Sequence, residues 1–372
     1  MATILHIIDH LGTGGAQTIL AQICKASVTH GDGAIVVSLR SQDSIWFREN
    51  AGSDTRIFES ESRKRITALI AMLMLLHRVR RLIQTNHVSV VHSHLPASQL
   101  FAILLRILCR GIDIRWCTSV YGTRLQIPAY YRFVLPMVML WNDVLFSIMQ
   151  DYELPSFVRL RCRVVKIPFT SSDLPDGTIG LEEILEHCGV SADDTLLIGV
   201  ARLSADKLID RYEPLFAMIG YYSYGKLMFV GSGELLDEYR RKAQAEHWGN
   251  VSFPGYIRES RALYQRADIM VTTSINSHFS VAALNAAAHG CLVVSLNLGT
   301  QQREVELATS GAPQYLRMLS CKSDAAFLKA VQRLLCNHEL RKRVTTMVDN
   351  LNSSTGQIRN LELYHSTYHG RI

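Results

Sequence analysis

Short apolar runs alternate with longer amphipathic stretches along nearly the whole chain. The runs carry Val, Ile and Leu at successive positions, which is typical of strands that are buried on both faces. Between them, apolar residues recur with the spacing of a helix that buries one face. The runs that predict strands are residues 3–9, 33–39, 88–92, 114–120, 144–149, 196–201, 226–231, 251–254, 269–273 and 291–296. This alternation predicts an α/β protein whose parallel sheets carry helices on both faces.

A segment rich in turn-forming residues divides this pattern in two. It reads Ile-Pro-Phe-Thr-Ser-Ser-Asp-Leu-Pro-Asp-Gly over residues 167–177, and the alternation restarts after it. A chain of 372 residues is also longer than one ordinary hydrophobic core supports. We therefore predict a first domain over residues 1–170 and a second over residues 171–353. A C-terminal helical segment, residues 354–372, is expected to pack back on the first domain.

The composition is that of a globular protein, with 48% hydrophobic and 19% charged residues. The best apolar run, residues 66–76, is shorter than the roughly 20 residues that span a bilayer, and no secretory signal precedes the first strand. Eight cysteines are scattered without Cys-x-x-Cys spacing, which predicts buried free thiols in a reducing, cytoplasmic compartment. The histidines show no His-Glu-x-x-His pattern, so we expect no metal site.

The formal charge of +6 is moderate, and the basic residues cluster in the first half. They lie within residues 63–81 and at Arg106, Arg110 and Arg115, beside apolar helical stretches. This pattern suits an anionic membrane surface or a lipid-phosphate acceptor, and it equally suits a solvated surface with extended arginines. Nucleic acid is not an expected partner, because no recognition helix or aromatic–basic alternation recurs.

Two loops that follow predicted strands can hold a phosphorylated ligand. Arg202 and Lys207 lie five positions apart in the loop after the strand at residues 196–201. Two cations in one loop can converge on a diphosphate and stabilise the charge that develops when it leaves. The turn Gly-Thr-Gly-Gly-Ala-Gln at residues 12–17 joins the first strand to the first helix, where backbone N–H groups face an anion. A tight strand–helix turn also uses glycine without any ligand.

Two histidines follow one another in the segment Val-His-Ser-His-Leu-Pro, residues 91–96. Open parallel sheets place their ligands at the carboxyl ends of strands, which favours His94 as a site residue and His92 as the second choice. A histidine at a strand end is also commonly a hydrogen-bonded structural residue. Both interpretations stay open on the residues alone.

Residues 274–300 hold the most specific pattern, a polar loop after a strand followed by an Ala-rich helix that ends at Gly290. The run resembles the donor-sugar site of retaining GT-B glycosyltransferases of family four. That site reads Ser-x-x-Glu-x-Phe-Gly and then Glu-Ala-x-Ala-x-Gly. The residues in register with it are Ser274, Phe279, Ala286, Ala288 and Gly290. Ser277 and Asn285 stand where the family has its two glutamates.

The resemblance extends over nearly the whole chain. Residues 12–17 resemble the family's Gly-Gly-Ala-Glu loop, and residues 200–207 resemble its Gly-Arg-Leu-x-x-x-Lys-Gly segment, with Leu208 in place of the last glycine. Residues 229–234 match an apolar-Gly-x-Gly strand end. The first domain departs from the pattern, since Tyr121 follows the strand after which relatives carry a histidine.

By this resemblance the fold is GT-B, two Rossmann-like domains facing across a cleft. It implies transfer, with retention and without metal or cofactor, from a nucleotide-diphosphate sugar to a saccharide or lipid-linked saccharide. The implied setting is bacterial surface polysaccharide or glycoconjugate synthesis at the inner face of the membrane. Arg202 and Lys207 would hold the diphosphate, His94 would touch the transferred sugar and Asn285 would bond the ribose. The other implied donor-site residues are Gly14, Gly15, Gly233, Tyr256, Ser277, Phe279 and Glu304.

Replacement of both motif glutamates leaves other functions open. The competing hypothesis is a non-catalytic GT-B protein that binds a sugar or partners an active transferase. A third hypothesis is a nucleotide-sugar epimerase of the same fold, which would release nucleotide with no acceptor present. Assays of nucleotide release distinguish the three.

Overall fold

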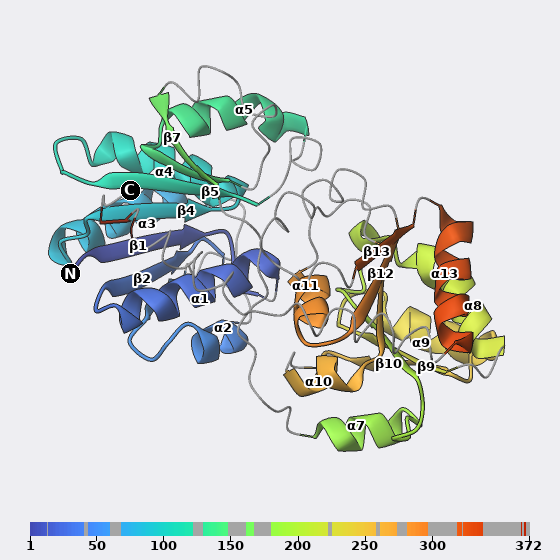
Figure 1. The fold of residues 1–372 in the computed structure, drawn as a ribbon. Helices are drawn as coiled ribbons and strands as arrows, with labels where there is room; N and C mark the ends of the chain where they lie inside the picture. The colour runs from blue at the N-terminus through green and yellow to red at the C-terminus, as the bar shows by residue number, and fades with distance from the viewer. Residues whose placement is uncertain are drawn as a thin grey trace. The chain divides into compact units, whose positions relative to one another are not determined.

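The computed structural model describes most of the chain in two compact units. The described residues are 1–12, 14–40, 44–59, 68–121, 129–147, 161–166, 180–221, 225–257, 261–273, 281–296, 318–321, 323–337, 366 and 368–369. The first unit comprises Met1–Pro168 and Gln357–Ile372, and the second comprises Phe169–Gly356. Each unit has its own sheet and its own cores (Figure 1).

The first unit is built on a seven-stranded parallel sheet in the order β3-β2-β1-β4-β5-β6-β7. Its strands are β1 (Thr3–Ile8), β2 (Gly33–Ser38), β3 (Arg56–Glu59), β4 (Val90–His94), β5 (Arg115–Val120), β6 (Val144–Ser147) and β7 (Arg163–Lys166). Consecutive side chains of the central strands are almost all buried, which explains their unbroken apolar runs.

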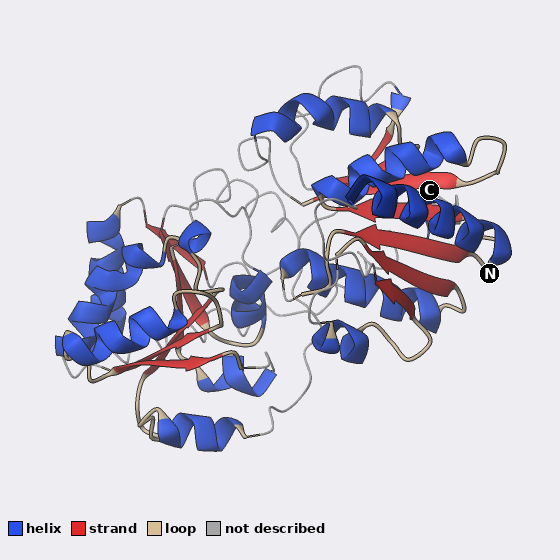
Figure 2. Ribbon diagram, turned by 180° about the vertical axis from the view of Figure 1, so that it is seen from behind, coloured by secondary structure: helices blue, strands red, loops and turns tan. Residues whose placement is uncertain are grey.

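Helices cover both faces of this sheet (Figures 1 and 2). They are α1 (Gly15–Thr29), α2 (Ile45–Asn50), α3 (Ala68–Thr85), α4 (Pro96–Leu108) and α5 (Ala129–Leu140). Helices α1 and α2 share a core with Ile8 of β1, whereas α3 and α4 share one with the neighbouring Ile7. Successive strand residues point to opposite faces, so one strand supplies both cores. Among the described helices, none is both long and apolar enough to span a bilayer.

The second unit holds a six-stranded parallel sheet in the order β10-β9-β8-β11-β12-β13. Its strands are β8 (Leu196–Val200), β9 (Lys226–Val230), β10 (Val251–Gly255), β11 (Ile269–Thr272), β12 (Leu292–Leu296) and β13 (Met318–Cys321). One face packs against α7 (Leu181–His187), α10 (Arg261–Arg266) and α11 (Val281–Ala288). The other packs against α8 (Glu213–Tyr221), α9 (Leu236–Ala245) and α13 (Asp324–Cys336).

The strand order reverses once in each sheet. In the first sheet, β1 lies between β2 and β4, and in the second sheet β8 lies between β9 and β11. Loops diverge at such switch points, which makes the carboxyl ends of these strands the usual ligand sites of open parallel sheets. Of the predicted site residues that the structure describes, Tyr256 follows the edge strand β10, and the others lie at these ends or in the loops and helices that follow them.

The sequence prediction of parallel α/β sheets is confirmed, and its misses are specific. The strand predicted at residues 88–92 lies at 90–94, so it contains both His92 and His94. Strands β3, β7 and β13 were not expected, and each lies at an edge of its sheet. The predicted free thiols are present, and six of the eight are buried, whereas Cys188 is partly exposed and Cys336 is exposed. Burial raises the pKa of the Cys162 thiol to about 12.

Candidate functional site

The loop after β8 carries the two predicted diphosphate ligands. The side chain of Arg202 is exposed, and its Nε donates a hydrogen bond to Oγ of the buried Ser204 at 3.1 Å. Lys207 ends a short 3-10 turn, Ala205–Lys207, and is partly exposed. Leu208, in place of the family glycine, has a φ of 52°, the left-handed conformation that glycine adopts without cost. Leucine therefore occupies here a backbone conformation that favours glycine.

The glycine-rich loop after β9 packs against the loop that carries Arg202 and Lys207, which we call the cationic loop. The N–H of Leu203 donates to the carbonyl oxygen of Ser232 at 3.0 Å, and Leu203 accepts from the N–H of Leu235 at 3.1 Å. A Cβ on Gly231 would overlap the carbonyl oxygen of Ala201, and one on Gly233 would overlap that of Leu203. Gly233 is thus required by close backbone packing. Its predicted place in the wall of a nucleotide pocket stays a prediction.

A buried tyrosine ties the cationic loop to the end of β11. Tyr212 lies in a second short turn, Ile209–Tyr212, and its hydroxyl oxygen accepts the N–H of Thr273 at 2.8 Å. Burial raises the pKa of this phenol, so it remains neutral. Tyr212 also packs edge-on against Phe229 of β9. Sequence reasoning missed Tyr212, because its apolar surroundings resemble ordinary core.

Two other predicted donor-site residues of the second unit lie within the described residues. Tyr256 follows β10 and is about half exposed. Asn285 lies in α11 and is buried. The backbone carbonyl oxygen of Asn285 accepts the N–H of His289, as in a regular helix. The predicted residues Ser277, Phe279 and Glu304 lie outside the described residues.

The glycine turn of the first unit begins α1. Gly14 and Gly15 are both exposed, and the first turn of α1 carries no acidic side chain. The partial positive charge of the helix N-terminus therefore has no carboxylate of its own turn beside it. Gln17 stands where the family has an acid, and its buried amide donates to the carbonyl oxygen of His10 at 3.2 Å. That bond holds the turn closed over the end of β1.

His94 and His92 are fully buried on β4. The Nδ1 atom of His94 lies 2.6 Å from the hydroxyl of Tyr121, and its Nε2 atom lies 3.2 Å from Nδ1 of His6 on β1. Burial, with a smaller contribution from His6, lowers the pKa of His94 well below its ordinary value. Both ring nitrogens of His94 thus contact protein groups, and its contact with a transferred sugar stays a prediction.

His92 anchors the C-terminal residues. Its Nδ1 atom lies 2.6 Å from the hydroxyl of Tyr368, and its Nε2 atom lies 2.8 Å from Oγ of Ser119. Beside this contact, the ring of His369 pairs with the buried carboxylate of Asp32 at 2.7 Å. The last described residues are therefore fixed to the first unit by polar contacts.

Part of the second unit is similar to a known glycosyltransferase domain. Residues 205–337 match a family model described as "Glycosyl transferases group 1". This segment begins in the cationic loop and ends just after α13. No curated protein matches the chain.

Solved glycosyltransferase structures match the chain over its full length. A sucrose-phosphate synthase from Thermosynechococcus elongatus has 17% sequence identity and a TM-score of 0.73, with 100% of both chains covered. HepE from Anabaena, in complex with UDP-glucose, has 12% identity and a TM-score of 0.75 with the same coverage. WaaG, a glycosyltransferase of lipopolysaccharide biosynthesis, has 12% identity and a TM-score of 0.67, covering 99% of this chain and 100% of that one. The chain therefore has the GT-B fold predicted from its sequence, and its second unit matches the group 1 glycosyltransferase domain.

Proposed function

We propose that the protein transfers a sugar from a nucleoside diphosphate sugar to a hydroxyl group of a saccharide or lipid-linked saccharide. The observation that carries this proposal is the placement of Arg202 and Lys207 in one loop at the switch point of the second sheet. The family match begins in this loop. Structural neighbours have been solved with UDP and with UDP-glucose.

In the proposed reaction, the bond between the anomeric carbon and the diphosphate oxygen breaks while a bond to the acceptor oxygen forms. Negative charge develops on the leaving diphosphate, and two fixed cations stabilise it more in the transition state than in the ground state. The acceptor hydroxyl gives its proton to the leaving phosphate, so no side-chain base is needed. Retention of configuration and independence from metal are carried over from the family resemblance.

Other residues have proposed binding roles. Asn285 bonds the ribose, because an amide both donates and accepts hydrogen bonds. Tyr256 contacts the base, and the Gly14–Gly15 turn binds the phosphates through its backbone. His94 contacts the transferred sugar, which requires that its side chain leave the contacts it makes with His6 and Tyr121.

We further propose that the first unit docks on an anionic membrane surface through α3, α4 and α5. Helix α4 packs against both of the others, so the three form one layer over the sheet. Eight large apolar side chains of this layer are exposed, namely Ile70, Leu73, Met74, Leu104, Ile107, Leu108, Met137 and Leu140. Arg78 and Arg81 are also exposed on α3, beyond its exposed apolar residues. None of the three helices contains an acidic residue. Apolar and basic groups without acids complement the charge of an anionic bilayer.

Vesicle sedimentation tests this docking. Vesicles that contain phosphatidylglycerol should bind the protein more strongly than vesicles of phosphatidylcholine alone. Leu73→Ser and Ile107→Ser should each weaken binding roughly tenfold, because each removes a large apolar side chain. The control is Tyr221→Ser, which changes an exposed aromatic residue of the second unit. Equal binding to both lipids, or equal loss in the control, would contradict the proposal.

The transfer reaction itself is tested with a panel of UDP and GDP sugars and saccharide acceptors. Nucleotide release that depends on the acceptor is expected, and Arg202→Ala should abolish most of it. Arg211→Ala is the matched control, because Arg211 lies in the next turn of chain and pairs with Asp324 on α13 at 3.5 Å.

The second candidate function is a sugar-binding GT-B protein without activity. The replacement of two acidic motif residues by Ser277 and Asn285 favours it. Tight binding of a nucleotide sugar, with no turnover for any donor and acceptor pair, would support this candidate against the first. Release of nucleotide without acceptor would instead indicate hydrolysis or epimerisation.

A further inference from the structure

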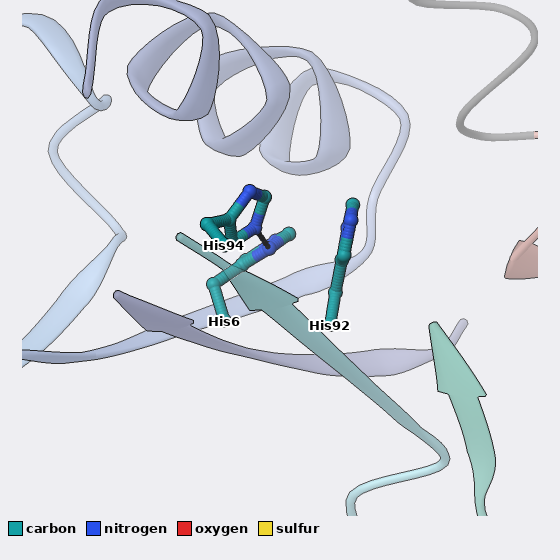
Figure 3. A group of neighbouring side chains, drawn as sticks. All are labelled: His6, His92 and His94. Atoms are coloured by element: carbon teal, nitrogen blue, oxygen red, sulfur yellow. Dashed lines mark hydrogen bonds between the residues drawn. The ribbon is translucent and has the colours of Figure 1, made fainter. Parts of the chain in front are cut away.

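Three histidines point from two neighbouring strands toward the same face of the first sheet (Figure 3). His6 of β1 lies opposite His92 in the parallel register, and His94 follows two positions later on β4. Residues two apart on a strand share a face, so the register brings the three imidazoles together. All three residues are fully buried.

The spacing of their nitrogens suits ligands of one metal ion. One nitrogen from each ring lies within 4.8 Å of the others, and Nδ1 of His6 lies 3.2 Å from Nε2 of His94. Two nitrogens bound to tetrahedral Zn²⁺ at its usual bond length are about 3.3 Å apart. Within the described residues, Nε2 of His6 is buried without a hydrogen-bond partner. This nitrogen gains a partner only if the ion binds His6 through Nε2 rather than through Nδ1.

We propose that His6, His92 and His94 form a binding site for a divalent transition metal, with Zn²⁺ as the expected ion. Imidazole nitrogens suit Zn²⁺, Co²⁺, Ni²⁺ and Cu²⁺ and bind Mg²⁺ and Ca²⁺ poorly. Metal binding requires neutral imidazole, and burial lowers the pKa of His6 to about 3, which keeps its ring neutral near pH 7.

The groups around the cluster resemble the outer shell of a histidine–metal site. Metal-binding histidines usually engage their second ring nitrogen in a hydrogen bond that fixes the ring. His94 presents Nε2 to His6 while its Nδ1 contacts the hydroxyl of Tyr121. His92 contacts Tyr368 through one ring nitrogen and Ser119 through the other. Binding of the ion to one of these nitrogens would break that contact and leave the other contact in place.

The ion would join β1 to β4 at the switch point of the first sheet. Through Tyr121 and Tyr368 it would also stiffen the end of β5 and the contact of the C-terminal residues. This role is structural, and an ion held by His94 would exclude the proposed contact of His94 with the sugar. The assignment of Arg202 and Lys207 to the diphosphate does not involve the histidines, so that proposal and this one fail separately. Sequence reasoning expected no metal site, because a strand register is not visible in the sequence.

The experiment uses full-length protein without a histidine tag, purified, stripped with chelator and titrated with ZnCl₂ against a chromophoric chelator. We expect one tightly bound Zn²⁺ per chain and a higher Tm with the ion. Co²⁺ in its place should give the intense visible absorption of a tetrahedral site. Failure of the wild-type protein to bind stoichiometric Zn²⁺ overturns the proposal, whatever the variants do.

Two variants locate the ion. His6→Asn should weaken Zn²⁺ binding at least 100-fold and remove the rise in Tm. His187→Asn is the control, because His187 is exposed at the end of α7 in the second unit. A wild-type affinity in His6→Asn, or an equal loss in His187→Asn, would show that the bound ion lies elsewhere.

Discussion

At their switch points the two sheets carry opposite kinds of side chain. After β8 of the second sheet, exposed Arg202 and partly exposed Lys207 extend from a loop that backbone contacts hold in place. At the end of β4 in the first sheet, His94 is fully buried and joined to other rings. Exposed cations remain available to a charged substrate, whereas buried imidazoles lose their charge. This contrast supports the proposal that the second unit holds the donor, and the contacts of the buried histidines join strands of the first unit.

The largest expected effect is that of Arg202→Ala on transfer. Loss of one of two cations at the leaving diphosphate should lower kcat/KM by roughly 100- to 1,000-fold, or about 3–4 kcal/mol of transition-state stabilisation. Arg202→Lys should recover part of the rate, since it keeps the charge and loses the forked geometry. The measurement is initial rates at several donor concentrations. If Arg202→Ala has the same kcat/KM as Arg211→Ala, the side chain of Arg202 does not stabilise the transition state.

An intermediate effect is expected from Gly233→Ala on stability. The added methyl group meets the carbonyl oxygen of Leu203, so the supporting loop must move, at a cost of about 1–3 kcal/mol. Urea unfolding measures this change in the free energy of unfolding. Gly249→Ala is the control, because nothing lies within 4 Å of its added Cβ. If Gly249→Ala lowers the free energy of unfolding as much as Gly233→Ala does, the close contact between Gly233 and Leu203 is not the cause of the loss.

A smaller effect is expected from Tyr368→Phe in the metal-free protein. The change removes the hydroxyl that contacts Nδ1 of His92, and with it a buried hydrogen bond. A cost of about 1–2 kcal/mol in the free energy of unfolding is expected. Tyr221→Phe, at an exposed position, should cost almost nothing. An unchanged free energy of unfolding in Tyr368→Phe would show that the contact between Tyr368 and His92 does not stabilise the fold.

The sequence predicted the central strands well because they are buried on both faces. The burial of β3 alternates along the strand, β7 reads Arg-Val-Val-Lys and β13 reads Met-Leu-Ser-Cys, so these edge strands left no continuous apolar run. The order of motifs also predicted which loops follow which strands, which placed Arg202 and Gly233 at one sheet edge. The approach of His6 to His94 depends on the register of β1 against β4, and the Tyr212–Thr273 bond depends on tertiary packing. Neither leaves a local sequence signal.

The most direct test of the account is calorimetric titration with a nucleoside diphosphate and with its nucleoside, in the wild-type protein and in the Arg202→Ala/Lys207→Ala double variant. UDP and GDP are tried first, and uridine or guanosine supplies the comparison. The account predicts that the double variant loses at least 100-fold in affinity for the diphosphate and little for the nucleoside, with Arg211→Ala unchanged for both. Wild-type affinity of the double variant for the diphosphate would contradict the assignment of the cationic loop to the donor.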